Sequence, residues 1–92
     1  MQDAELDELR RAIDEVDSEL LALIAARVRL VLRVGEWKRR NGRAVYDPER
    51  ERRVLARLTE RLPAPLDAET VRRIFERVID ESRRIEQRDV GR

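Results

Sequence analysis

Arg27 occupies a position that a long helix normally gives to an apolar side chain. Apolar residues recur every three or four positions from Leu6 to Trp37, and Arg27 interrupts that series. A guanidinium keeps its charge at ordinary pH, so it needs an anionic partner in an apolar setting. Lys38 follows eleven residues later, which brings it to within about 20° of the same direction on an α-helix. Two cations on one helix face predict an anion-binding pocket between helices.

Three further polar residues fall on apolar faces. Glu51 shares the face of the apolar residues three and four positions after it, Ser82 continues a later apolar line, and Glu86 lies one turn beyond Ser82. Each has a simple structural explanation when taken alone. Ser82 can bond to a carbonyl one turn back, Glu51 can pair with a surface arginine, and Glu86 can mark a fraying helix end. Together with Arg27 and Lys38, however, they predict a polar site inside a helical bundle.

The chemistry of such a site is limited by what it lacks. The sequence contains no nucleophile paired with a base, no metal-ligand cluster and no glycine-rich phosphate loop. We therefore expect no metal site and no acyl transfer, and a reaction that depends on substrate shape and electrostatic stabilisation. Gly35 adds one observation, because glycine inside a helix costs about 1 kcal/mol relative to alanine. It indicates either close packing of helices or space that a ligand needs.

Composition excludes several classes of protein. The 92 residues carry 21 basic and 20 acidic side chains, so the net charge is only +1 and the signs are interleaved. A nucleic-acid surface would need a basic excess on one face. Cysteine and histidine are absent, which removes disulfides and the commonest metal ligands. No signal peptide and no membrane span are predicted. We expect a cytoplasmic protein that binds neither nucleic acid nor membrane.

The apolar pattern predicts an all-α domain over residues 1–92, with one very long helix and two shorter ones. The expected helices cover about residues 3–40, 48–62 and 67–88. No strand pattern or internal repeat is present.

Local signals set the expected helix ends. Asn41-Gly42 tolerates the left-handed conformation that closes a helix. Asp47-Pro48 supplies an N-cap followed by a proline at the first helical position. Asp67 is the expected cap of the last helix, after the rigid Pro63-Ala64-Pro65 connector.

The length of the first helix predicts assembly. About 36 residues at 1.5 Å each give roughly 54 Å, whereas a compact domain of this size has a radius of gyration near 12 Å. The two shorter helices cannot cover such a rod, so a monomer would expose a large apolar surface. We therefore predict a homodimer in which the long helices of two chains pack together. A coiled coil is the alternative, but it leaves the two shorter helices without a clear role.

The ordered set of residues resembles the AroQ-type, all-helical chorismate mutases over about residues 5–88. No single piece is specific, but the spacing of the whole set is. The resemblance lies in Leu9-Arg10-x-x-Ile13-x-x-x-Asp17-x-x-Leu20-Leu21-x-Leu23-Ile24-x-x-Arg27, Val34-Gly35-x-x-Lys38, Asp47-x-x-Arg50-Glu51 and Ser82-x-x-x-Glu86. It implies an intertwined homodimer of three-helix chains. The implied reaction is the cofactor-free Claisen rearrangement of chorismate to prephenate, an isomerase step toward phenylalanine and tyrosine.

The resemblance also implies roles for four cations. Arg27 would grip a carboxylate of the substrate, and Arg10 would do so in the site of the partner chain. Lys38 would bind a carboxylate and the ether oxygen of the breaking bond, and Arg50 would line the pocket. Seventeen residues separate Arg10 from Arg27, which is about 25 Å of helix. Arg10 therefore cannot serve a small ligand beside Arg27 of its own chain.

The remaining roles fall on oxygen-bearing side chains. Glu51 and Asp47 would hold the ring hydroxyl, Ser82 would contact a carboxylate, and Glu86 would meet the ether oxygen. Well-known members of the family carry glutamine at the position of Glu86, though others carry glutamate. A carboxylate cannot donate a hydrogen bond, so Glu86 must be protonated to assist. Burial would raise its pKa and nearby cations would lower it.

Two other functions stay open at this point. An isochorismate pyruvate lyase of the same fold has the same need for carboxylate binding. A non-catalytic helical dimerisation or regulatory module would need none of the five polar residues for activity. The mutase itself could also work best when bound to another enzyme of the shikimate pathway.

Overall fold

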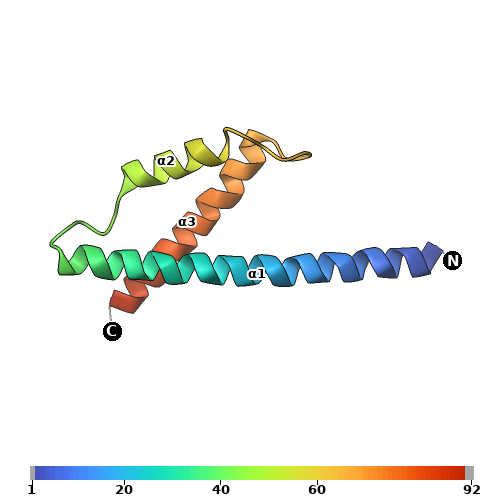
Figure 1. The fold of residues 1–92 in the computed structure, drawn as a ribbon, viewed down its shortest axis with the longest axis horizontal. Coiled ribbons are helices and arrows are strands. Elements are labelled where there is room, and N and C mark those ends of the chain that lie inside the picture. The colour runs from blue at the N-terminus through green and yellow to red at the C-terminus, as the bar shows by residue number, and fades with distance from the viewer. Residues whose placement is uncertain (1, 91–92) are drawn as a thin grey trace. The chain divides into compact units, whose positions relative to one another are not determined.

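A computed structural model describes residues 2–90, and within them it contains three helices and no strand. They are α1 (Gln2–Arg40), α2 (Pro48–Leu58) and α3 (Ala68–Val90), as Figure 1 shows. The prediction of an all-α chain with one very long helix and two shorter ones is confirmed. The chain divides into two compact units, Met1–Leu30 and Val31–Arg92, and α1 runs from the first into the second. That residues 1–92 form one domain stays a prediction, and residues 1, 91 and 92 lie outside the described part.

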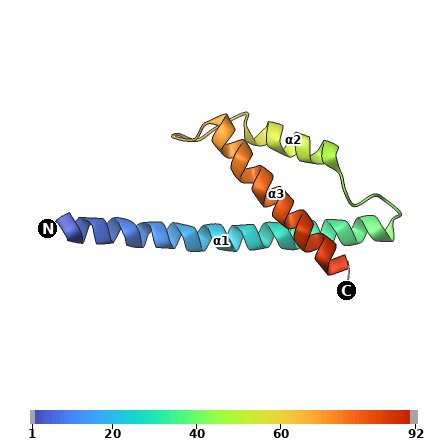
Figure 2. The same ribbon diagram turned by 180° about the vertical axis from the view of Figure 1, so that it is seen from behind.

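Helix α1 is uninterrupted in Figures 1 and 2. Acidic residues lie in its first turn, and Lys38, Arg39 and Arg40 lie in its last, as the helix dipole favours. Gly42 then takes the left-handed conformation with φ 66°, as predicted. The backbone N–H of Arg43 donates to the Lys38 carbonyl at 2.8 Å, which closes the helix end. None of the described helices is long and apolar enough to cross a membrane.

The apolar stripe of the first unit faces solvent in the single chain. Leu9 and Ile13 are each 57% exposed, and Val16 and Leu20 are exposed as well. Contiguous apolar surface of this kind normally marks a contact with another macromolecule. The first unit therefore contains a helix whose apolar face has no cover within residues 2–30.

Helix α2 begins as predicted and ends early. The Asp47 side chain caps it, with Oδ1 accepting from the Arg50 backbone N–H at 3.0 Å, and Pro48 opens the helix. It ends at Leu58 rather than at Leu62. The Thr59 hydroxyl donates to the Leu55 carbonyl at 2.9 Å, and Thr59 is the C-cap. Threonine is a weak helix former, so its local hydrogen bonds compete with continuation of the helix.

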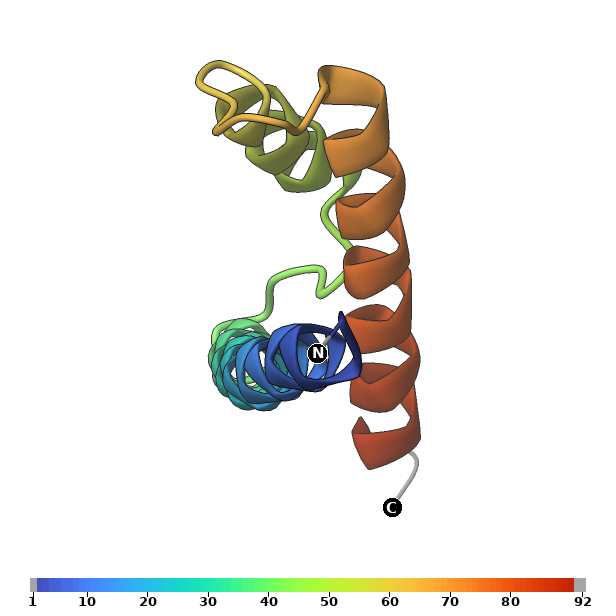
Figure 3. The ribbon, with the colours of Figure 1, turned by 90° about the vertical axis from the view of Figure 1, so that its right-hand side faces the viewer.

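Helix α3 packs against α2 within the second unit, and Figure 3 shows it as one straight helix. Asp67 caps it as predicted, because its Oδ1 accepts from the Thr70 N–H at 2.8 Å. Val54 of α2 and Val71 and Ile79 of α3 are buried at this contact. Ile74 belongs to the predicted apolar stripe but is 52% exposed. The core of the second unit is therefore smaller than the stripe indicated.

Candidate functional site

Lys38, at the end of α1, is tied to the N-terminus of α2. Its Nζ donates to Asp47 Oδ2 at 3.3 Å, and its side chain is only 18% exposed. Asp47 uses its other oxygen to cap α2. The Arg50 backbone N–H, and then the Lys38 ammonium, lower the pKa of the Asp47 carboxyl. Lys38 is thus held in a half-buried position by a carboxylate that is itself fixed by the helix end.

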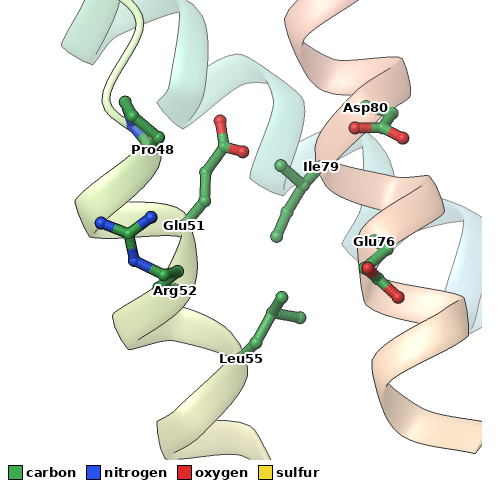
Figure 4. A pocket seen from close by; sticks show the side chains of 7 residues that line it. All are labelled: Pro48, Glu51, Arg52, Leu55, Glu76, Ile79 and Asp80. Atoms are coloured by element: carbon green, nitrogen blue, oxygen red, sulfur yellow. The ribbon is translucent and has the colours of Figure 1, made fainter. Parts of the chain in front are cut away.

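Glu51 projects from α2 into the space in front of α3. Figure 4 shows it with Leu55 of α2 and Ile79 of α3, around a pocket of about 230 Å³. Its Oε1 accepts a hydrogen bond from the Nη2 of Arg83, which lies on α3. The guanidinium of Arg83 also lies 4.8 Å from the centre of the Tyr46 ring. Glu51 therefore pairs with an arginine, as its simple explanation expects, but the partner is half-buried and lies on another helix rather than on the nearby surface.

Ser82 and Glu86 are the buried polar residues of α3, with 2% and 8% exposure. The Ser82 hydroxyl donates to the Val78 carbonyl at 2.7 Å, as its structural explanation expects. Burial raises the pKa of Glu86, and the charges of Arg39, Lys38 and Arg83 act in the opposite direction. The burial of Glu86 rules out a frayed helix end as its explanation. A buried carboxyl among cations is the arrangement from which a proton donor can be made.

Gly35 explains how Glu86 reaches its position. A Cβ atom built on Gly35 would lie 2.0 Å from Glu86 Oε2 and 2.9 Å from its Cδ, closer than real side chains approach. Gly35 is itself buried. The glycine therefore serves close packing, and the group that needs the space is the Glu86 carboxyl.

A second pocket, of about 290 Å³, opens beside Glu86 and is at the lower end of the range for small-molecule sites. Its mostly apolar wall carries two guanidinium groups and one buried carboxyl. The lining residues are Arg39, Val45, Tyr46, Arg83, Glu86 and Gln87. Such a wall can bind an anionic organic molecule.

Six of the predicted site residues lie in the second unit: Lys38, Asp47, Arg50, Glu51, Ser82 and Glu86. Lys38 and Asp47 are in direct contact, and Lys38 is close enough to Glu86 to lower its pKa. The Arg50 side chain is exposed, and its backbone N–H completes the α2 cap.

Arg10 and Arg27 lie in the first unit, where Arg10 is exposed and Arg27 is half-buried. Their grouping with the residues of the second unit stays a prediction.

Arg83, Arg39 and Tyr46 were missed by sequence reasoning. Arg83 is one residue beyond Ser82, so it is about 100° away from the face on which the predicted residues lie. A cation on that side of an amphipathic helix has the appearance of an ordinary solvated residue. In the sequence, the only sign of such a residue was the presence of several arginines within a few positions of Glu86.

Comparison with known proteins identifies the family. The sequence matches the family described as chorismate mutase type II over residues 9–87. The T-protein of Enterobacter agglomerans is 45% identical over 82 residues, which are 86% of this chain and 21% of that protein. A chorismate mutase of Methanocaldococcus jannaschii is 43% identical over 53 residues, covering 58% of this chain and 54% of that protein. The chain thus spans about a fifth of the first of these relatives.

A solved structure agrees over nearly the whole chain. Chorismate mutase (form II) from Thermus thermophilus superposes with a TM-score of 0.87 and 37% identity, covering 91% of this chain and 96% of that one. The expected function, chorismate mutase, and its enzyme class, isomerase, agree with these matches. The chain belongs to the chorismate mutase type II family.

Proposed function

We propose that this chain converts chorismate to prephenate by an intramolecular Claisen rearrangement without a cofactor. In this reaction the ether C–O bond breaks as a new C–C bond forms within one molecule. The observation that supports it most is the burial of Glu86 next to Gly35, with Lys38, Arg39 and Arg83 near enough to act on its pKa. That arrangement supplies a proton donor and fixed positive charge, and the rearrangement requires little more.

The proposed chemistry depends on charge that develops at the ether oxygen. The Lys38 ammonium and a protonated Glu86 would both donate to that oxygen, so they stabilise the transition state more than the substrate. Glu51, with the Asp47 region, would accept from the ring hydroxyl. Ser82 would contact a carboxylate, and Arg50 would line the pocket. Holding the flexible substrate in its reactive folded shape removes the entropy cost of reaching it.

We also propose that the working form is an intertwined homodimer. The exposed apolar residues of α1, among them Leu9, Ile13 and Val16, are the support for this proposal. In such a dimer Arg27 would grip one carboxylate of the substrate, and Arg10 of the second copy would grip the other. The site would then be complete only between two chains. A further shikimate-pathway enzyme as a partner would be recognised by a rise in activity when it is added.

Two measurements test the activity. The loss of chorismate is followed by ultraviolet absorbance, and the product is identified as prephenate. Isochorismate is supplied in a parallel reaction. Rapid conversion of isochorismate to pyruvate, with chorismate left intact, would favour the lyase over the mutase. No turnover of either substrate would leave only a non-catalytic module.

A mixing experiment tests the shared site. Arg10→Ala and Arg27→Ala are each expected to be nearly inactive. In a mixed dimer one site regains both arginines and the other loses both, because the two sites exchange these residues. Random re-association of equal amounts should therefore restore about one quarter of the wild-type activity. If the mixture stays as inactive as its components, each site is built by one chain.

A further inference from the structure

We propose that Arg83 is a positioning residue that orients the Glu51 carboxylate toward the ring hydroxyl of the substrate. The inference rests on the proposed function, in which Glu51 takes that hydroxyl. It adds a residue that none of the sequence motifs contains.

The contact between Arg83 and Glu51 differs from the other ion pairs of the described residues. Most of those join side chains three or four positions apart on one helix, and they are largely exposed. Arg83 on α3 reaches Glu51 on α2, and the two side chains are only 29% and 27% exposed. A half-buried pair between two helices fixes the position of both groups more firmly than a pair along one helix surface.

Arg83 is itself held from two further sides. Its guanidinium lies over the Tyr46 ring at 4.8 Å, and its Nη1 is 3.5 Å from Asp80 Oδ1. The Nε atom is buried, and no acceptor for it is found within residues 2–90. An unsatisfied buried donor costs free energy, so the Tyr46 ring and the Asp80 carboxylate help to hold the side chain where it is. Such an arginine has little freedom to follow Glu51, and Glu51 must conform to it.

The atoms of the pair leave room for a substrate. Arg83 Nη2 occupies Glu51 Oε1, and a carboxylate has further lone pairs on its second oxygen. Oε2 is then the acceptor for the hydroxyl, in a direction set by the rigid guanidinium fork. Without Arg83 the carboxylate would rotate freely about its terminal bonds. The hydroxyl contact would exist in both the ground state and the transition state, so its loss should act mainly on KM.

Arg83→Gln tests the proposal. We expect KM for chorismate to rise about tenfold, with kcat changed by less than about threefold. The matched control is Arg84→Gln, because Arg84 is the next residue, is 64% exposed and pairs with Glu81 along the same helix. That variant should have wild-type kinetics. Circular dichroism and thermal melting verify that both variants are folded.

A second background separates positioning from general structural support. In Glu51→Gln, where the carboxylate is gone, Arg83→Gln should raise KM by less than about twofold more. If the two substitutions multiply their effects, or if Arg83→Gln alone has the wild-type KM, the proposal is wrong. If Arg83→Gln does not fold, Arg83→Lys is measured instead, both in the wild type and in Glu51→Gln, and the same outcomes decide the proposal. A wild-type chain without mutase activity would refute the proposed function, whereas an active wild type with an unaffected Arg83 variant would refute only this inference.

Discussion

Replacing Gly35 by alanine should separate stability from activity in this protein. A Cβ at that position would lie 2.0 Å from Glu86 Oε2, and an ordinary contact begins at 3.4 Å. The carboxyl oxygen must therefore retreat by about 1.4 Å. Glu86 is flexible enough to move, but it is buried and close to Lys38, so its new position will not be the productive one.

The stability terms nearly cancel. Alanine in place of glycine inside a helix gains about 1 kcal/mol, and forcing one side chain off its rotamer costs about 0.5–1.5 kcal/mol. The free energy of unfolding should therefore change by less than about 0.5 kcal/mol. The activity terms do not cancel, because a displacement of about 1 Å at a reacting group can cost about 100-fold. We expect kcat/KM to fall by that factor, which corresponds to about 2.7 kcal/mol.

The test combines urea unfolding, at one protein concentration, with the chorismate absorbance assay. Glu86→Ala provides the control background, because it removes the group that the new Cβ would meet. There Gly35→Ala should stabilise the fold by the full increment of about 1 kcal/mol. The reasoning is refuted if Gly35→Ala stabilises the wild type and the Glu86→Ala variant equally. It is also refuted if the single variant keeps wild-type activity.

Three further outcomes follow from the charges of the site. Only a protonated Glu86 can donate a hydrogen bond, and burial raises its pKa, so wild-type kcat should fall as pH rises through that pKa. Glu86→Gln should make the pH–rate profile flat. Identical pH–rate profiles for the wild type and the variant would exclude this role. Asp47 has a lowered pKa, so the stability that it contributes is present above its ordinary pKa and is lost as pH falls through the lowered pKa. The Tm difference between the wild type and Asp47→Asn should therefore disappear in acid. A Tm difference that does not change with pH would contradict this expectation. Arg27→Ala should lose about 3–4 kcal/mol of transition-state stabilisation, measured as a fall in kcat/KM. The variant should sediment like the wild type. A purely structural role for Arg27 would instead change its sedimentation.

The helix starts and the long first helix could be predicted because their signals are local. Asp47-Pro48 and Asp67 each combine a capping side chain with the residues that follow it, and both caps form as expected. The end of α2 was misjudged because Leu62 fits the apolar pattern, whereas the hydroxyl of Thr59 ends the helix earlier. Periodicity thus gives the extent of an apolar face better than the end of a helix.

The candidate site was predictable where a polar residue interrupts an apolar face. The burial of Ser82 and Glu86 follows from that pattern. Arg83 was not predictable, because its pairing with Glu51 depends on how two helices approach each other and on the reach of a long side chain. The reason for Gly35 became clear only when the distance to Glu86 was known.

The exposed apolar stripe of α1 has a kinetic consequence. Helices in proteins gain most of their stability from packing, and residues 2–30 contain no second helix to pack against. In the proposed dimer, ordering of this segment and encounter with a second chain become one step. Refolding should then contain a phase whose rate rises in proportion to protein concentration, and Tm should also increase with concentration. Dilution would deplete the active species by unfolding residues 2–30 of α1, well before the capped helices α2 and α3 come apart.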